Sequence, residues 1–336
     1  MTAFIEMLRK VVMFVALALP GFFLIKSKIL KQEQSAPLSK LLTTVAMFFF
    51  IMTSTVKNVS FAVKDLATLG VSALIGIGWT VAIFFLSKPL TFFEKTPLLV
   101  PENAEDNEIW QKKKNGMLRF CSIFSNNGFL GIPLAMAVLG ENSPALAVLI
   151  IINIITNLAM LTLGDYIISG GTVKLNFVKI ITNPVVLGFA IGVVLNLTNV
   201  CALVPEISQF TTHFSNLVTP LSMTILGMKM GAVNLAKIFT NWKMYYSALI
   251  KLVLTPTLII ALLFGLKYAF KLHIIDKYML LGVFMAFSMP TAGLASPLAD
   301  KNNGDIENSV VYTLGSTILS VITIPLLYML LTLILG

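Results

Sequence analysis

The sequence has 336 residues, of which 57% are hydrophobic and 12% are charged, and its formal net charge is +9. Soluble domains carry about 25% charged residues, so this chain lacks the polar side chains needed to cover a water-facing surface. The composition excludes a soluble enzyme. It also excludes a nucleic-acid-binding protein, because the 24 Lys and Arg are scattered and form no dense cluster with aromatic residues.

Apolar stretches follow one another along the whole chain, and a helix needs about 20 apolar residues to cross a bilayer. We expect the first stretch to be a transmembrane helix broken at Pro20, rather than a cleaved signal. The sequence predicts an all-α membrane protein with about ten transmembrane helices: 11–25, 38–56, 66–86, 117–139, 145–168, 181–197, 210–230, 245–270, 278–298 and 310–335.

The distribution of Lys and Arg between alternate linkers predicts the orientation. If the N-terminus lies outside, 16 of these residues fall in inside linkers and 7 in outside linkers. Cytoplasmic linkers retain the positive charge. We therefore expect a multi-pass protein of the cell (inner) membrane with both termini outside.

Helix-breaking prolines recur at similar places in the two halves of the chain. Pro20 and Pro184 are 164 residues apart, and Pro133 and Pro290 are 157 residues apart. A repeat with an odd number of spans enters the membrane upside down the second time, as in many secondary transporters. We predict two inverted five-helix repeats, residues 1–170 and 171–336, although each proline alone is also compatible with a plain kink.

The fourth span contains residue types that a stable helix avoids. Asn126 and Asn127 precede Gly128, Gly131 and Pro133. In a helix, each Gly costs about 1 kcal/mol and Pro about 3 kcal/mol relative to Ala. We expect the helix to be unwound around 128–133. Unpaired backbone at this depth must line a wet cavity or be buried in protein, and the two amides can bond that backbone or a polar solute.

The ninth span is broken at the equivalent place by Pro290, Thr291 and Gly293. If helices 4 and 9 cross at their breaks, two half-helix N-termini point at one spot, which can hold an anion without a buried Lys or Arg. The alternative is that both prolines only make hinges.

Other polar residues lie within the spans. Asn153 and Asn157 share a helix face, and they line a solute site or join helices. Lys251 lies inside the eighth span, where an ionisable group is a functional candidate, but extension of its side chain toward the membrane interface is the simpler expectation. The predicted substrate-binding residues are Asn126, Asn127, Gly128, Gly131, Pro133, Asn153, Asn157, Pro290 and Thr291. We predict no catalytic residue, metal or cofactor.

Three stretches resemble the auxin efflux carrier family, and in particular its bacterial members similar to malate or malonate permeases. They are Ser125-Asn126-Asn127-Gly128-Phe129-Leu130-Gly131-Ile132-Pro133-Leu134, Thr182-Asn183-Pro184-Val185-Val186, and Thr219-Pro220-Leu221-Ser222-Met223 through Gly227. The resemblance implies an elevator-type carrier of carboxylates. In it spans 1, 2, 6 and 7 would form a scaffold, and spans 3–5 and 8–10 would move.

The main hypothesis is therefore a secondary transporter of small organic anions, such as the dicarboxylates malate or malonate, and not an enzyme. The alternatives are a sodium-coupled symporter of the bile-acid type and, with less support from the residues, an intramembrane enzyme. We expect the lipid bilayer and the organic anion as partners, together with a coupling proton or sodium ion, and a homodimer is possible. No nucleic-acid partner is expected.

Overall fold

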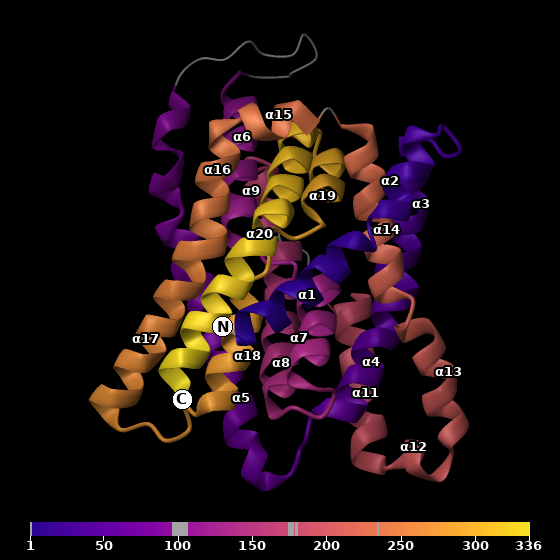
Figure 1. The fold of residues 1–336 in the computed structure, drawn as a ribbon, viewed down its shortest axis with the longest axis vertical. Coiled ribbons are helices and arrows are strands. Elements are labelled where there is room, and N and C mark those ends of the chain that lie inside the picture. The colour runs from indigo at the N-terminus through magenta and orange to yellow at the C-terminus, as the bar shows by residue number, and fades with distance from the viewer. Residues whose placement is uncertain (1, 96–106, 174–177, 179–180, 234) are drawn as a thin grey trace.

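The computed structural model describes residues 2–95, 107–173, 178, 181–233 and 235–336, and these form an all-helical protein (Figure 1). The first half contains α1 (Thr2–Ala16), α2 (Leu19–Lys26), η1 (Gln32–Gln34), α3 (Ser35–Leu41), η2 (Leu42–Ala46), α4 (Met47–Asn58), α5 (Val63–Leu86), η3 (Lys88–Lys95), α6 (Asn107–Ile123), η4 (Asn127–Gly131), α7 (Ile132–Leu139), α8 (Pro144–Ala159), η5 (Met160–Gly164) and α9 (Asp165–Ile168). The second half contains α11 (Pro184–Thr198), α12 (Val200–Leu203), α13 (Pro205–Ser215), α14 (Val218–Ala232), α15 (Leu235–Thr240), α16 (Trp242–Leu249), η6 (Ile250–Leu254), α17 (Thr255–Phe270), α18 (Lys277–Phe287), α19 (Ala295–Lys301) and α20 (Ile306–Leu335).

Six helical segments of the described chain are long and apolar enough to cross a membrane, which makes this a multi-pass membrane protein. They are Ala3–Lys26, Gln32–Asn58, Asp65–Thr91, Pro144–Ile168, Trp242–Phe270 and Ile306–Leu335. Four of the ten predicted spans are not among them. The fourth and ninth are broken, the sixth is the 15-residue α11, and the seventh is divided into α13 and α14.

Two helix pairs make very close backbone contacts through glycine. A Cβ added at Gly21 of α2 would lie 1.9 Å from the Thr224 carbonyl oxygen, and one at Gly227 of α14 would lie 1.8 Å from the Ala18 oxygen. Helix α4 packs against α11 in the same way, since a Cβ at Gly188 would lie 2.4 Å from a backbone oxygen. Small residues allow membrane helices to approach so closely.

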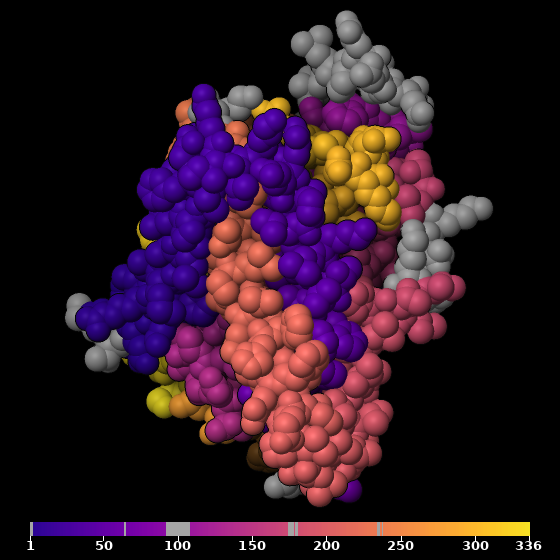
Figure 2. Space-filling view, turned by 90° about the vertical axis from the view of Figure 1, so that its right-hand side faces the viewer, coloured from indigo at the N-terminus to yellow at the C-terminus, as the bar shows by residue number. Residues whose placement is uncertain are grey.

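These four close-packed helices belong to the predicted spans 1, 2, 6 and 7. Figure 2 shows α14 as an orange band flanked on both sides by the indigo N-terminal helices. The division into a fixed scaffold and a moving unit, and the inverted repeat itself, stay predictions.

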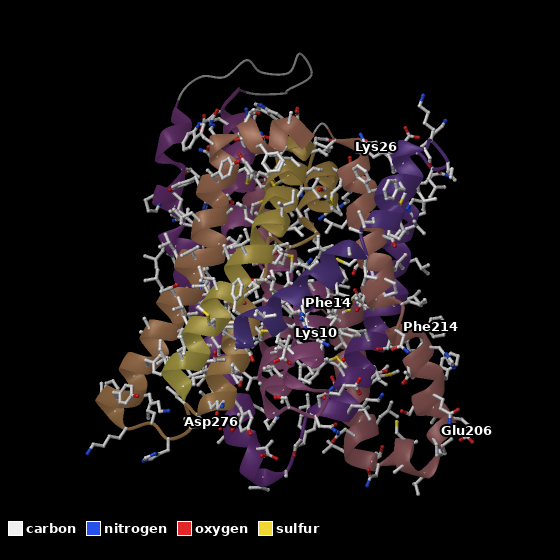
Figure 3. All side chains as sticks on the ribbon, viewed as in Figure 1. Lys10, Phe14, Lys26, Glu206, Phe214 and Asp276 are labelled. Carbon is white, nitrogen blue, oxygen red and sulfur yellow. The ribbon has the colours of Figure 1, made fainter. Side chains whose placement is uncertain are left out.

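The two ends of the molecule carry the linkers that the sequence assigns to opposite sides of the membrane. Lys26, at the end of α2, lies near one end, whereas Glu206 and Asp276 lie near the other (Figure 3). Both chain termini lie in the same half as Glu206 and Asp276 (Figure 1).

Four helical segments among the described residues are π-helical: η2, η4, η5 and η6. Such wide turns are rare and are often found at functional sites. The segment η4 contains Asn127, and η6 contains Lys251. Both segments lie where the two broken helices meet.

Candidate functional site

The two broken helices are joined to each other at their breaks. The first runs as α6, loses its helical form at Phe124 and resumes as η4 and α7, and the second is interrupted between α18 and α19. Ser125 and Thr291 form an isolated antiparallel β-bridge. The Asn126 N–H donates to the Pro290 oxygen at 2.7 Å, and the Ala292 N–H donates to the Phe124 oxygen at 3.0 Å. Each break therefore satisfies backbone groups that the other leaves unpaired, which is what allows irregular backbone at this depth.

The first break lies earlier than the sequence predicts. Residues 128–133 are helical, and the break covers 124–126. The glycines serve close packing instead: a Cβ at Gly128 would lie 3.0 Å from Asn153 Oδ1, and one at Gly131 would lie 3.0 Å from Met289 Cγ. Pro133 is the second residue of α7, which continues directly from the π-helical η4, so it does not end the helix. The expected unwinding at 128–133 is therefore wrong.

The second break lies where the sequence places it. Residues 288–294 are non-helical and include Pro290, Thr291 and Gly293. Thr291 is fully engaged, because its N–H donates to Ser316 Oγ at 3.1 Å and its hydroxyl donates to the Cys121 oxygen at 2.8 Å. It therefore holds the crossing in place.

The predicted asparagines form a buried polar cluster beside the crossing. The Asn127 amide donates to Thr156 Oγ1 at 2.8 Å, and the Asn157 amide donates to Asn153 Oδ1 at 2.7 Å. Asn127 Oδ1 and Asn153 Nδ2 are buried and have no hydrogen-bond partner in the described part of the chain. A buried acceptor and a buried donor left unpaired are costly, which makes this cluster a candidate site for a polar solute.

Lys251 is the functional candidate that the sequence analysis placed wrongly. It is fully buried, and its ammonium donates to Ser125 Oγ at 2.5 Å and to the Phe287 oxygen at 3.3 Å. Phe287 is the last residue of α18, so its carbonyl is one that the helix leaves unpaired. Lys251 therefore bonds to residues of both broken helices instead of reaching the interface. The only signal in the sequence was a charge inside an apolar run.

A small cavity of about 50 Å³ separates the crossing from α3, η2 and α14. Asn126, Phe129 and Gly293 line it from the crossing, and Lys229 of α14 and Thr43 of η2 line it from the opposite side. Lys229 is its only charged lining residue among the described ones. This volume holds no more than a few water molecules, so the cavity is too small for an organic substrate in this conformation.

A larger cavity of about 630 Å³ lies away from the crossing and is lined by Lys88, Lys112 and Arg119. Its cations already have partners. Arg119 donates to Ser87 Oγ and to the Phe84 oxygen, and Lys112 pairs with Glu108 at 2.6 Å. The crossing, with its unpaired amide atoms, is the better candidate for the functional site.

All nine predicted site residues lie at the crossing or on the helices packed against it. The structure brings together residues of η4, α7, α8 and the 288–294 break. The described residues contain no group of three or more His, Cys, Asp or Glu that could hold a metal ion. The role of each residue in substrate binding stays a prediction.

Residues 217–335 match the family model described as Sodium Bile acid symporter family. The matched part is about a third of the chain and contains α14, the second broken helix and α20. No curated protein matches the chain. The fold and this match define the class: a multi-pass membrane protein that is similar, over its C-terminal part, to sodium-coupled secondary transporters.

The match corrects one expectation and agrees with another. The predicted membership of the auxin efflux carrier family is wrong, because the family that matches is the sodium bile acid symporter family. The expected malate or malonate substrate depended on that membership and loses its support. The matched family consists of transporters and not of enzymes, which agrees with the expectation that this protein is not an enzyme.

Proposed function

We propose that the protein is a secondary transporter of an organic anion and that the crossing of the two broken helices is its substrate site. The observation that carries the proposal is the bridge between Ser125 and Thr291, next to a small cavity. Broken helices that meet at mid-depth are the usual binding site of secondary transporters.

The charges around the crossing support an anionic substrate. Lys251 lies in the crossing itself, and Lys229 lines the cavity beside it. None of the described residues that line this cavity is acidic. Because a membrane protein pays heavily to bury a charge, two lysines without a carboxylate partner at this site favour a substrate that brings a negative group.

Transport would require the small cavity to open to each side in turn. One surface of the cavity belongs to α3, η2 and α14, and the other belongs to η4, residues 293–297 and α20. In the proposed mechanism the first group, with α2, α4 and α11, is fixed and the crossing moves past it. The glycine-mediated contacts of α2 with α14 support a rigid fixed group.

Uptake into proteoliposomes tests the proposal. Labelled carboxylates would be offered one at a time, from short mono- and dicarboxylates to bile acids, with empty liposomes as background. We expect uptake of at least one, reduced by about tenfold or more in Asn126→Ala, since a lost contact of about 1.4 kcal/mol has this effect. Uptake of none of them, or uptake that Asn126→Ala leaves unchanged, would contradict the proposal.

Asn196→Ala is the matched control for this variant. Asn196 also carries a membrane-embedded amide, but it donates to the Val56 and Val59 oxygens, away from the crossing. Its loss is expected to lower stability and to leave uptake per folded molecule unchanged.

Sodium coupling is the second candidate, because the matching family is named for it. Uptake with sodium replaced by potassium or choline on the outside tests it directly. A strict need for sodium would support coupling.

We also propose that the protein lies in the cell (inner) membrane with its Lys26 end in the cytoplasm. Cys201, in the partly exposed α12, would then face outward, whereas Cys121 is buried. A membrane-impermeant maleimide should label the protein in intact cells, and Cys201→Ser should abolish the labelling. Labelling only after permeabilisation would reverse the orientation.

A further inference from the structure

The Lys251 ammonium lies at the C-terminal end of α18, which is the kind of position where a free cation can bind in a broken-helix transporter. The α18 helix ends at Phe287, next to the break, so the negative end of its helix dipole lies at the crossing. In broken-helix transporters such helix ends and unwound carbonyls coordinate the coupling cation. In this chain the Phe287 oxygen accepts a hydrogen bond from Lys251 Nζ.

The oxygen atoms nearest to the ammonium are neutral. Its second partner is Ser125 Oγ, a hydroxyl from the first broken helix. No ion pair joins Lys251 to a carboxylate of any described residue, and two buried acids elsewhere in the fold are already engaged. Asp165 pairs with Lys301, and Asp305 caps α20 by accepting from the Asn308 N–H and amide.

A sodium ion fits this site poorly. It would share the Phe287 oxygen with an ammonium of the same charge, in a medium where like charges repel strongly. The buried oxygens without a partner among the described residues include Asn127 Oδ1, Ser288 Oγ and Thr255 Oγ1, and all three are neutral. With Lys251 protonated, the crossing holds one positive charge, and no carboxylate of a described residue pairs with it to allow a second.

The lysine is not explained by packing alone. An apolar side chain of similar volume would fill the same space without the cost of burying an amine, and the two oxygens it bonds could be paired by a hydroxyl. Intramembrane ionisable residues of this kind generally have a functional role.

We propose that Lys251 is a tethered cation that takes the place of the coupling sodium ion, so that the protein binds and moves its anionic substrate independently of sodium. The inference rests on the proposed transport function for the substrate, but the absence of a sodium site can be tested without any substrate.

The first measurement uses the wild-type protein alone. Purified protein in detergent is equilibrated with radioactive ²²Na⁺, and its melting temperature is compared in sodium, potassium and choline chloride. A ligand that binds only the folded state raises the melting temperature. We expect no saturable ²²Na⁺ binding and the same melting temperature in all three salts. Saturable binding, or stabilisation specific to sodium, would overturn the proposal.

The second measurement uses uptake of whichever carboxylate the wild type moves. We expect the rate in sodium and in choline medium to agree within about twofold. Lys251→Met should lower the rate by at least about tenfold in both media, and Lys251→Arg, which keeps the charge, should retain more of it. Equal uptake by Lys251→Met and the wild type would also overturn the proposal.

Thr255→Val is the matched control, since Thr255 is a fully buried residue one turn further along the same helix, and its hydroxyl has no partner among the described residues. It should leave uptake close to that of the wild type. If Lys251→Met does not fold, Lys251→Arg and the ²²Na⁺ measurement still decide. If no carboxylate is taken up in either medium, the proposed function fails, while the sodium-binding result stands independently.

Discussion

Two lysines of the second half show how differently one side chain can be used in the same fold. Lys301, at the end of α19, has a side chain that is 45% exposed, and it forms an ion pair with Asp165 of α9. Asn302 donates to the same carboxylate at 2.7 Å. Lys251 is fully buried, and both of its partners are neutral oxygens.

We call the Lys301–Asp165 pair a fastening contact, since it is an ion pair that joins two helices. We call Lys251 a poised charge, since its partners among the described residues are neutral. The Lys301 pair is complete, so it joins α9 to α19 and leaves no charge for a ligand. The Lys251 charge is balanced only by hydroxyl and carbonyl dipoles, so an incoming anion gains from it.

The largest effect is expected at the poised charge. Lys251→Met removes the ammonium and keeps the volume, so carboxylate binding should weaken by at least about tenfold. Stability should change little, because the cost of burying an amine is removed while the Ser125 and Phe287 oxygens lose a donor. Isothermal titration and a melting curve on the same sample check both. A large loss of stability with unchanged binding would make Lys251 a fastening residue like Lys301.

The second effect concerns the polar cluster next to the charge. Asn127→Ala removes an unpaired acceptor and the donor to Thr156 Oγ1. We expect uptake to fall by roughly threefold to tenfold, with stability within about 1 kcal/mol of the wild type. Thr156→Val removes only the hydroxyl that orients the amide, so it should cause a smaller loss. Uptake that responds to Thr156→Val but not to Asn127→Ala would exclude the amide from the site.

The sequence predicted the crossing because its residue types are costly in an ordinary helix. Pro290 and Gly293 lie in the observed break, and Asn126 lines the cavity. The prediction from the sequence misplaced the first break. A glycine that loosens a helix and a glycine that allows a neighbouring helix to approach cannot be told apart in a single sequence. Gly128 and Gly131 prove to be of the second kind, close to Asn153 and Met289.

Lys251 could not be placed from the sequence for a different reason. Whether a lysine inside an apolar run reaches the interface depends on which face of the helix it occupies and on what packs there. The bonds to Ser125 and Phe287 span 126 and 36 residues of sequence. Such contacts arise only when the two breaks come together. Periodicity within one helix does not report them.

The third effect is expected at the fastening contact. The Asp165 side chain is 7% exposed and the Lys301 side chain is 45% exposed. Solvent therefore screens this ion pair in part. Asp165→Asn should lower the free energy of unfolding by about 1–2 kcal/mol, between the values for exposed and buried pairs. Uptake per folded molecule should not change. A double-mutant cycle with Lys301→Met isolates the pair, and a coupling energy near zero would show that α9 and α19 are held by other contacts.

The smallest effect is expected at a third lysine, whose side chain is more than half exposed to solvent. Lys112 pairs with Glu108 one turn earlier in α6, and the two side chains are 54% and 74% exposed. Exposed pairs of this spacing contribute about 0.3–0.5 kcal/mol, so Lys112→Met should shift the melting temperature only slightly and leave uptake unchanged. Raising the salt concentration should remove even this difference. If Lys112→Met reduced uptake as strongly as Lys251→Met, the loss of any positive charge would be enough, and burial at the crossing would no longer explain why Lys251 matters.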